Sequence, residues 1–214
     1  MIDLLVAGAG PVGLVTAIHG ALSGLDVTVV EPRTAPIDKA CGEGLMPNAV
    51  AHLSRIGVDP EGVPFHGIRY LAGTHVAQAR FSAGAGRGVR RTVLDELLLE
   101  RARSAGVSFA QGRVSSLDVG TDYVEACGVR ARYLVGADGL HSDVRRLAGL
   151  ARPGRGGAPR FGLRQHFTVE PWTDLVDVHW LPDAEVYVTP VGERLVGIAV
   201  LGGAPLDLPG TIAR

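Results

Sequence analysis

Three glycines near the beginning of the chain have the spacing of a loop that binds a dinucleotide. They stand in the stretch Gly8-Ala9-Gly10-Pro11-Val12-Gly13. In such a loop the first glycine permits a tight turn, the second lets the backbone approach a pyrophosphate, and the third lets a helix pack closely on a strand. The free N–H groups and the dipole at the helix start favour the anion. Gly8, Gly10, Pro11, Val12 and Gly13 are therefore candidate binding residues, the alternative being a simple glycine-rich turn.

An acidic residue, Glu31, follows where dinucleotide-binding proteins contact a ribose. It closes the second predicted strand, and a carboxylate there accepts hydrogen bonds from the adenosine ribose. Its charge would repel a 2′-phosphate, so we expect the loop to hold FAD or NAD and not NADP. Pro32 and Arg33, the next two residues, join Glu31 as candidate cofactor contacts.

A second acidic residue, Asp138, lies between glycines far downstream, in the stretch GADGLHSDVRR. It follows the buried strand predicted at Tyr133–Val135, so its side chain should lie at the carboxyl edge of the sheet, where ligands bind in such folds. An Asp-Gly pair alone is also common in ordinary turns, and on that fact alone both interpretations stay open.

These side chains need a parallel sheet with helices to bring them together. Ile2–Ala7 and Asp26–Val30 are short apolar runs typical of parallel strands buried on both faces. The helical stretch Leu14–Ser23 lies between them, so the region predicts a βαβ unit of about 30 residues.

The rest of the chain alternates helical and strand patterns. Further helices are expected from Pro47 to Gly57 and from a Thr92 cap to Gly106, with β structure at residues 65–86 and 107–125. A linker-like stretch, Ala151–Pro159, precedes four predicted strands: Phe161–Val169, Leu175–Leu181, Glu185–Thr189 and Leu195–Leu201. The fold class is α/β, a Rossmann-like nucleotide-binding domain with a parallel sheet plus part of a β-rich domain.

Composition excludes several classes of protein. The 214 residues are 46% hydrophobic and carry a formal net charge of −1, which argues against a disordered chain and a nucleic-acid surface. No apolar run reaches the roughly 18–20 residues of a membrane span, and the N-terminus does not resemble a signal peptide. Two cysteines, Cys41 and Cys127, make neither a disulfide framework nor a metal site. A cytoplasmic protein without a metal is expected, and the richness in glycine and alanine suggests a GC-rich bacterial genome.

The Asp138 segment resembles the DG motif, roughly GADGxxSxVR, of the flavoprotein monooxygenase superfamily, the group of para-hydroxybenzoate hydroxylase. The matching residues are Gly136, Ala137, Asp138, Gly139, Ser142, Val144 and Arg145. The family also places an arginine ahead of a helix as R-x-x-L-x-x-x-L, which Arg91, Leu94 and Leu98 match. The resemblance implies that the cofactor is FAD and that Arg91, Asp138 and Gly139 contact it.

The segment Cys41-Gly42-Glu43-Gly44-Leu45-Met46-Pro47 corresponds to the superfamily loop that passes near the isoalloxazine ring. Aromatic hydroxylases often end this loop in GLHP, whereas the Cys-Gly opening is similar to the geranylgeranyl-reductase branch. Cys41 and Gly42 are therefore candidate FAD contacts. Cys41 has no base beside it and is not expected to be a nucleophile; the alternative is a small apolar loop residue.

The hairpin from Val186 to Val200 resembles the strand pair that walls the substrate pocket in the same branch. Val188 and Thr189 stand where that branch commonly has tryptophan and phenylalanine, so the aromatic wall is reduced. Trp172 and Trp180 are expected to be packing residues of the β layer.

A third superfamily motif, a late Gly-Asp pair, has no match in residues 147–214. The chain is therefore expected to cover about half of a family member, as a truncated protein or a fragment that needs a partner. The resemblance divides it into an FAD-binding domain at residues 1–64 and 88–152 and part of a β-rich substrate domain at 65–87 and 153–214.

The resemblance implies an FAD-dependent monooxygenase that uses NAD(P)H and oxygen to hydroxylate a small organic substrate. No catalytic residue is identified. A flavin-dependent reductase of the geranylgeranyl type is the first alternative, and a non-catalytic FAD-binding fragment lacking the C-terminal half is the second. The expected partner is a small organic molecule, with no nucleic acid and no membrane span. A second copy in a dimer or the missing C-terminal half is also expected.

Overall fold

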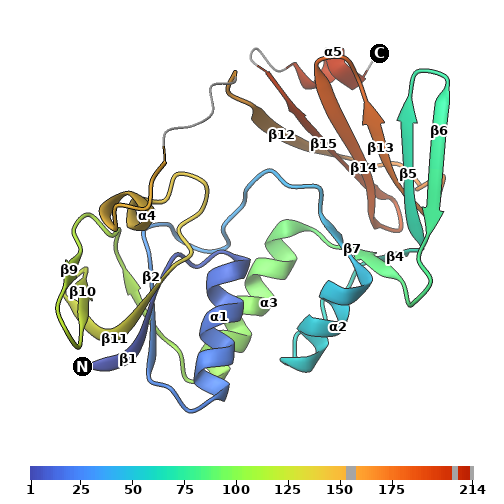
Figure 1. Ribbon diagram of the computed structural model, residues 1–214. Coiled ribbons are helices and arrows are strands. Elements are labelled where there is room, and N and C mark those ends of the chain that lie inside the picture. Colours follow the sequence, from blue (N-terminus) through green and yellow to red (C-terminus); the bar gives the residue numbers. More distant parts are fainter. Residues whose placement is uncertain (153–157, 204–206, 213–214) are drawn as a thin grey trace. The chain divides into compact units, whose positions relative to one another are not determined.

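The computed structural model describes residues 1–152, 158–203 and 207–212 (Figure 1). The chain divides into two compact units. The first contains residues 1–37, 56–58 and 94–154, and the second contains residues 38–55, 59–93 and 155–214. The predicted linker at 151–159 has its central residues, 153–157, outside the described part.

The first unit is built on a six-stranded sheet in the order β8-β2-β1-β11-β10-β9. The neighbours β8, β2, β1 and β11 pair in parallel, and β10 and β9 continue the sheet antiparallel. Because β1 is central, the glycine loop after it and the Asp138 turn after β11 leave the sheet from neighbouring strand ends. The strands are β1 (Ile2–Ala7), β2 (Val27–Glu31), β8 (Ser108–Gln111), β9 (Asp118–Val119), β10 (Val124–Ala126) and β11 (Val129–Gly136).

Helix α1 (Pro11–Leu22) follows β1 directly and buries one side in the first unit. Its Leu14 and Ile18 are fully buried, as are Leu5 and Val29 on the strands. Burying such a side chain contributes about 1.5–3 kcal/mol to folding, so the central strands form a rigid base for the loop. Residues 94–104 of helix α3 (Arg91–Ser104) and the short α4 (Asp143–Leu147) complete the regular elements of the first unit.

The second unit contains a six-stranded sheet in the order β12-β15-β14-β13-β5-β6 and a small sheet in the order β3-β7-β4. Strands β13 and β5 pair in parallel, and the other pairs are antiparallel. The large sheet has β5 (Gly67–Ala72), β6 (His75–Arg80), β12 (Phe161–Phe167), β13 (Val176–Trp180), β14 (Ala184–Gly192) and β15 (Leu195–Gly202). The remaining elements are β3 (Gly44–Leu45), β4 (Val63–Phe65), β7 (Gly86–Gly88), α2 (Pro47–Arg55) and α5 (Leu208–Ile212).

The α/β fold class is confirmed, and most predicted elements occur with shifts of a few residues. The predicted Thr92 cap is wrong, because α3 already begins at Arg91. The compact units also differ from the expected domains, since residues 38–55, 59–64 and 88–93 group with the second unit. Close backbone packing explains part of this difference: a Cβ on Gly88 of β7 would overlap the carbonyl of Pro190 on β14.

The expected packing role of the two tryptophans is also wrong. Trp172 and Trp180 are each 59% exposed. Trp180 does contact one ring, that of Tyr70, edge to face with centroids 6.0 Å apart. Among the helices within the described ranges, none is long and apolar enough to cross a membrane.

Candidate functional site

The three glycines of the N-terminal loop have different surroundings. Gly8 has a φ of 104°, and a Cβ there would lie 2.5 Å from the carbonyl oxygen of Ala137. A Cβ on Gly13 would overlap the carbonyl of Gly8. A Cβ on Gly10 would meet nothing within 4 Å. The loop is therefore packed at its first and third glycines and open at its second, where a ligand backbone could approach.

The beginning of α1 has the features of an anion site. Pro11 occupies the first turn, the N-cap residue Gly10 supplies no side-chain cap, and the first turn carries no acidic residue. Val12 is 70% exposed. Since the first N–H groups of a helix have no partners within it, they and the helix dipole favour a phosphate at this end.

Glu31 is buried, and both of its carboxylate oxygens are engaged within the first unit. Oε2 accepts from the Ala9 N–H at 2.9 Å, and Oε1 accepts from the backbone N–H and Nε of Arg33 at 3.1 and 2.7 Å. Burial alone would raise the pKa of Glu31, but the hydrogen bonds from Arg33 and Ala9 outweigh it and lower the pKa. The ionised carboxylate therefore connects the end of β2 to the glycine loop.

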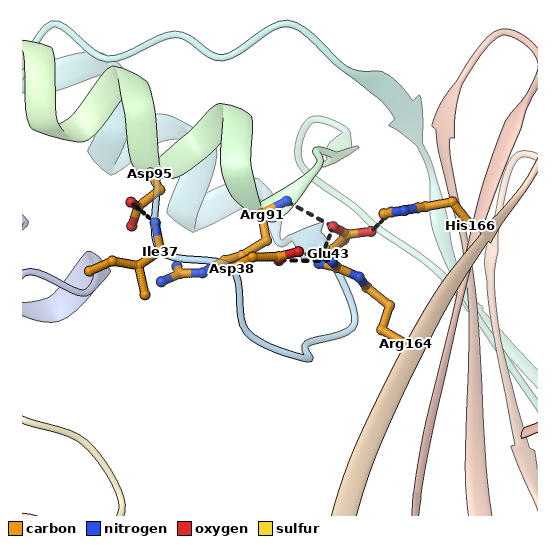
Figure 2. Close-up of polar contacts among 7 residues, drawn as sticks. All are labelled: Ile37, Asp38, Glu43, Arg91, Asp95, Arg164 and His166. Atoms are coloured by element: carbon orange, nitrogen blue, oxygen red, sulfur yellow. Dashed lines mark hydrogen bonds and ion pairs between the residues drawn. The ribbon is translucent and has the colours of Figure 1, made fainter. Parts of the chain in front are cut away.

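A cavity of about 230 Å³ lies beside Glu31 in the first unit. Its walls combine apolar, aromatic and guanidinium groups, which suit a heteroaromatic ring with polar edges. Asp95 lines it and also accepts from the Ile37 N–H at 2.8 Å, as Figure 2 shows. The lining residues are Ala9, Leu14, Glu31, Arg33, Thr34, Ala35, Ile37, Asp95, Leu99, Arg103, Phe109, Ala110 and Gln111.

Asp138 combines one satisfied and one unsatisfied oxygen. Its Oδ2 accepts from the Val144 N–H at 3.1 Å, at the beginning of α4. Its Oδ1 is buried and has no hydrogen-bond partner within the described residues. Gly139, with a φ of 88°, turns the chain away, and Ala137 donates its N–H to the Ala7 carbonyl at 2.8 Å. A buried acceptor without a donor is costly, so this oxygen fits a ligand hydroxyl or N–H.

The structure thus brings together three predicted groups in the first unit. The glycine loop touches the Ala137–Asp138 turn through Gly8, and Glu31 joins the same loop through Ala9. These contacts are those expected of a dinucleotide site, and the open side of Gly10 and the free Oδ1 of Asp138 fit FAD.

The other predicted residues, Cys41, Gly42 and Arg91, belong to the second unit and surround Glu43. The Glu43 side chain is 1% exposed and its φ is 57°. One carboxylate oxygen accepts from the Arg91 N–H at 2.8 Å and from Arg164 Nη1 at 2.7 Å. The other lies 2.7 Å from His166 Nε2. Figure 2 shows these groups converging on the carboxylate.

Strand β14 holds the same loop through Thr189. Its hydroxyl donates to the Gly42 carbonyl at 2.7 Å, and Thr189 is 1% exposed. The residue that stands in place of a family aromatic therefore fixes the loop backbone. Cys41 is exposed at the surface, yet desolvation of its sulfur raises the pKa of the thiol, as does the Glu43 charge to a smaller extent. A raised pKa does not favour a thiolate nucleophile.

Sequence reasoning missed the side chains that hold this loop: Glu43, Arg164, His166 and Thr189. Glu43 had a signal, because it is an acidic residue between two glycines, as Asp138 is. Arg164 and His166 are two residues apart on β12, so they lie on one face, but alternation alone does not reveal a distant carboxylate. In the part of the chain that the structure describes, no cluster of three His, Cys, Asp or Glu side chains could hold a metal ion.

Comparison with known proteins supports these features. Residues 1–194 match the sequence profile of a family described as FAD binding domain. The chain is 30% identical over 175 residues to the rifampicin monooxygenase of Streptomyces venezuelae, covering 72% of this chain and 35% of that protein. It is 33% identical over 168 residues to digeranylgeranylglycerophospholipid reductase 2 of Methanopyrus kandleri, covering 69% of this chain and 40% of that protein.

Solved structures agree on the fold. The p-nitrophenol 4-monooxygenase PnpA of Pseudomonas putida DLL-E4 superimposes with a TM-score of 0.80 at 20% identity, covering 99% of this chain and 60% of that one. The match covers less than half the length of each of the two relatives, the rifampicin monooxygenase and the archaeal reductase.

Proposed function

Because the chain belongs to the family of FAD-binding domains, we propose that it forms the cofactor-binding part of an FAD-dependent monooxygenase that hydroxylates a small organic substrate. The observation that carries the proposal is the buried, unpartnered Oδ1 of Asp138 beside the glycine loop. A family resemblance predicts an acidic ligand there, and the geometry provides an acceptor that no other described group satisfies.

The proposed cofactor contacts divide into three groups. The loop would surround the pyrophosphate through the backbone N–H groups of Gly10, Val12 and Gly13. Gly8, whose N–H donates to the Val30 carbonyl, and Pro11, which has no N–H, would line the same turn. Glu31, Pro32 and Arg33 would contact the adenosine end of the cofactor beside the cavity. Glu31 would act mainly by holding the glycine loop and by orienting the Arg33 side chain. Asp138 and Gly139 would contact the polar chain of the cofactor, and Cys41, Gly42 and Arg91 would contribute from the second unit.

Bound FAD would supply the redox chemistry, accepting a hydride from a nicotinamide and passing electrons on. The residues of this chain would bind and orient it. Asp138 would accept a hydrogen bond at Oδ1, the α1 N-terminus would neutralise phosphate charge, and the Glu31–Arg33 pair would keep the loop in place. No described side chain is assigned as a general acid or base.

A flavin-dependent reductase of the geranylgeranyl type is the second candidate function. Two observations favour it: the Cys41-Gly42 opening of the loop and the 33% identity to the archaeal digeranylgeranylglycerophospholipid reductase. Both functions would use the same FAD site, so they differ in what the reduced cofactor reacts with.

We also propose the remaining features of the reaction. NAD(P)H would be the reductant, and the bacterial cytoplasm, where it is available, would be the location. The partner would be a small organic substrate, with a second copy of the chain or a further C-terminal half completing the substrate site. The matched lengths of the relatives support this last point, since each extends well beyond the matched region.

Titration with FAD tests cofactor binding, and oxygen consumption then tests the reaction. We expect a yellow protein whose flavin absorbance shifts on binding. A colourless chain with no spectral shift would contradict FAD binding by this chain, and with it the monooxygenase, the reductase and the non-catalytic FAD-binding fragment alike.

For the catalytic protein, NAD(P)H oxidation coupled to oxygen uptake and a hydroxylated product supports the monooxygenase. Consumption of an alkene acceptor with oxygen untouched supports the reductase.

A further inference from the structure

We propose that Glu43 is a positioning residue, whose buried carboxylate clamps the loop Asp38–Glu43 so that Cys41 and Gly42 present a fixed backbone to the flavin. The contact with flavin rests on the proposed function, whereas the clamp itself is a property of the second unit. All groups that form it, on the loop and on strands β12 and β14, belong to that unit.

The clamp is built on a buried charge. The Glu43 side chain is 1% exposed, and its carboxylate contacts three groups: the Arg91 N–H, the Arg164 guanidinium and the His166 imidazole. Glu43 also has a left-handed φ of 57°, a backbone conformation that residues other than glycine adopt at a cost in free energy. A buried carboxylate with this backbone is retained only where its surroundings compensate for both costs.

One guanidinium, that of Arg164, contacts both ends of the loop. Arg164 Nη1 contacts Glu43 at 2.7 Å, and Nη2 contacts both oxygens of Asp38 at 2.8 and 2.9 Å. Only Lys39, Ala40, Cys41 and Gly42 lie between these two acids. The guanidinium therefore joins the two ends of the loop. A lysine could not make the same contacts, because it lacks the planar fork of hydrogen-bond donors.

The carboxylate also lies close to strand β15, and the loop backbone has hydrogen bonds of its own. A Cβ placed on Gly197 of β15 would lie 2.9 Å from Glu43 Oε2. The backbone of Glu43 is also fixed, because its carbonyl accepts the Val89 N–H at 2.8 Å. Together with the bond from Thr189 to the Gly42 carbonyl, these contacts fix the loop through both side chain and backbone.

The carboxylate also takes the place of a helix cap. Arg91 is the first residue of α3, and its N–H donates to Glu43 from 48 positions away. A negative charge at this end of a helix is stabilising. Glu43 thus ties the loop to the beginning of the helix that carries Arg91, the other proposed cofactor contact of the second unit.

The test uses the thiol of Cys41 as a reporter of loop order and FAD as a reporter of positioning. In a Cys127→Ser background, Cys41 is the only thiol. Its reaction rate with an aromatic disulfide is measured across pH, so that the limiting thiolate rate is separated from any change in pKa. In Glu43→Gln, we expect the limiting rate to rise and FAD binding to weaken, each about tenfold, as expected when a charge-assisted hydrogen bond is lost.

Two further variants make the result specific. Glu185→Gln is the matched control, because Glu185 is a hydrogen-bonded carboxylate on β14 of the same sheet, bound to Tyr187 and Arg160. It should leave both readouts unchanged. Arg164→Lys keeps the charge but not the fork, and should raise the thiol rate even if Glu43→Gln fails to fold.

The outcomes separate the two hypotheses. Unchanged thiol rates in both Glu43→Gln and Arg164→Lys would overturn the clamp. A thiol rate that rises while FAD affinity and spectrum stay the same would overturn the positioning role. If the wild-type chain binds no FAD while the thiol rate rises as expected, the proposed function fails and the clamp remains.

Discussion

Two acidic residues between glycines, Asp138 and Glu43, have opposite situations in this protein. Asp138 in the first unit has a buried oxygen with no partner among the described residues, whereas both oxygens of Glu43 in the second unit are engaged. The same local pattern therefore yields an open acceptor in one place and a saturated anchor in the other. Hydrogen-bond satisfaction, more than residue type, separates a candidate ligand from a structural group.

The largest expected effect is on stability, from removing the saturated acid. Glu43→Ala should lower the free energy of unfolding by about 3–5 kcal/mol, because it removes the buried carboxylate of an ion pair and leaves Arg164 paired with the exposed Asp38 alone. Urea unfolding of apo protein measures it. Asp138→Ala serves as the comparison and should cost about 1 kcal/mol, since it loses one backbone hydrogen bond. Equal costs for the two variants would break the comparison.

The next effect separates the packed from the open glycines of the loop. Gly13→Ala should destabilise the apo protein by about 1–3 kcal/mol, because its Cβ overlaps the Gly8 carbonyl. Gly10→Ala meets nothing within 4 Å and should change stability by no more than about 0.5 kcal/mol. It should nevertheless weaken FAD binding if the cofactor approaches there. Thermal unfolding and FAD titration of both variants check this; loss of stability in Gly10→Ala would be the contrary result.

A smaller effect concerns the third acid, Glu31, whose partners are all within the first unit. Its pKa is lowered in the folded protein from the ordinary value of 4.5. The stability it contributes is therefore fully present above about pH 4.5 and is lost as pH falls through the lower folded value. Unfolding of wild type and Glu31→Gln should differ by about 1–2 kcal/mol at pH 6 and converge at acid pH. A difference that grows on acidification would contradict the assignment.

The smallest expected effect is on the pKa of one tyrosine, whose hydrogen bond involves neither Asp138 nor Glu43. The hydroxyl of Tyr187 donates to Glu185 at 2.5 Å, and this bond raises the pKa of Tyr187 to about 12. In ultraviolet titration, one tyrosine should ionise near that pH, and Tyr187→Phe should remove that phase. A titration in which Tyr187→Phe removes a phase near pH 10 would contradict the hydrogen bond.

The sequence predicted the first unit better than the second, for physical reasons. Apolar strands such as Ile2–Ala7 and the glycine spacing depend on neighbours in sequence, so the βαβ unit could be identified from local patterns. The beginning of α3 could not, because the group that satisfies the Arg91 N–H is Glu43, 48 positions away. Capping preferences consider only residues close in sequence, so they favour Thr92 and cannot indicate a distant carboxylate.

The same limitation applies to the candidate site. Asp138 was identified because its strand-turn context is local, and Glu43 was passed over although it has a similar glycine context. Its role depends on Arg164 and His166 on β12, more than 120 positions away. Thr189 was interpreted as a lost aromatic residue, while its hydroxyl in fact holds the Gly42 carbonyl.

The most direct test of the contrast between the two acids is FAD titration of wild type and Asp138→Ala, followed by flavin absorbance. The wild type should bind FAD with a shifted spectrum. Asp138→Ala should bind at least about tenfold more weakly, because the cofactor loses a hydrogen bond to a charged, buried acceptor. The same dissociation constant in both proteins would contradict the assignment of Asp138 as the open acceptor of the cofactor site.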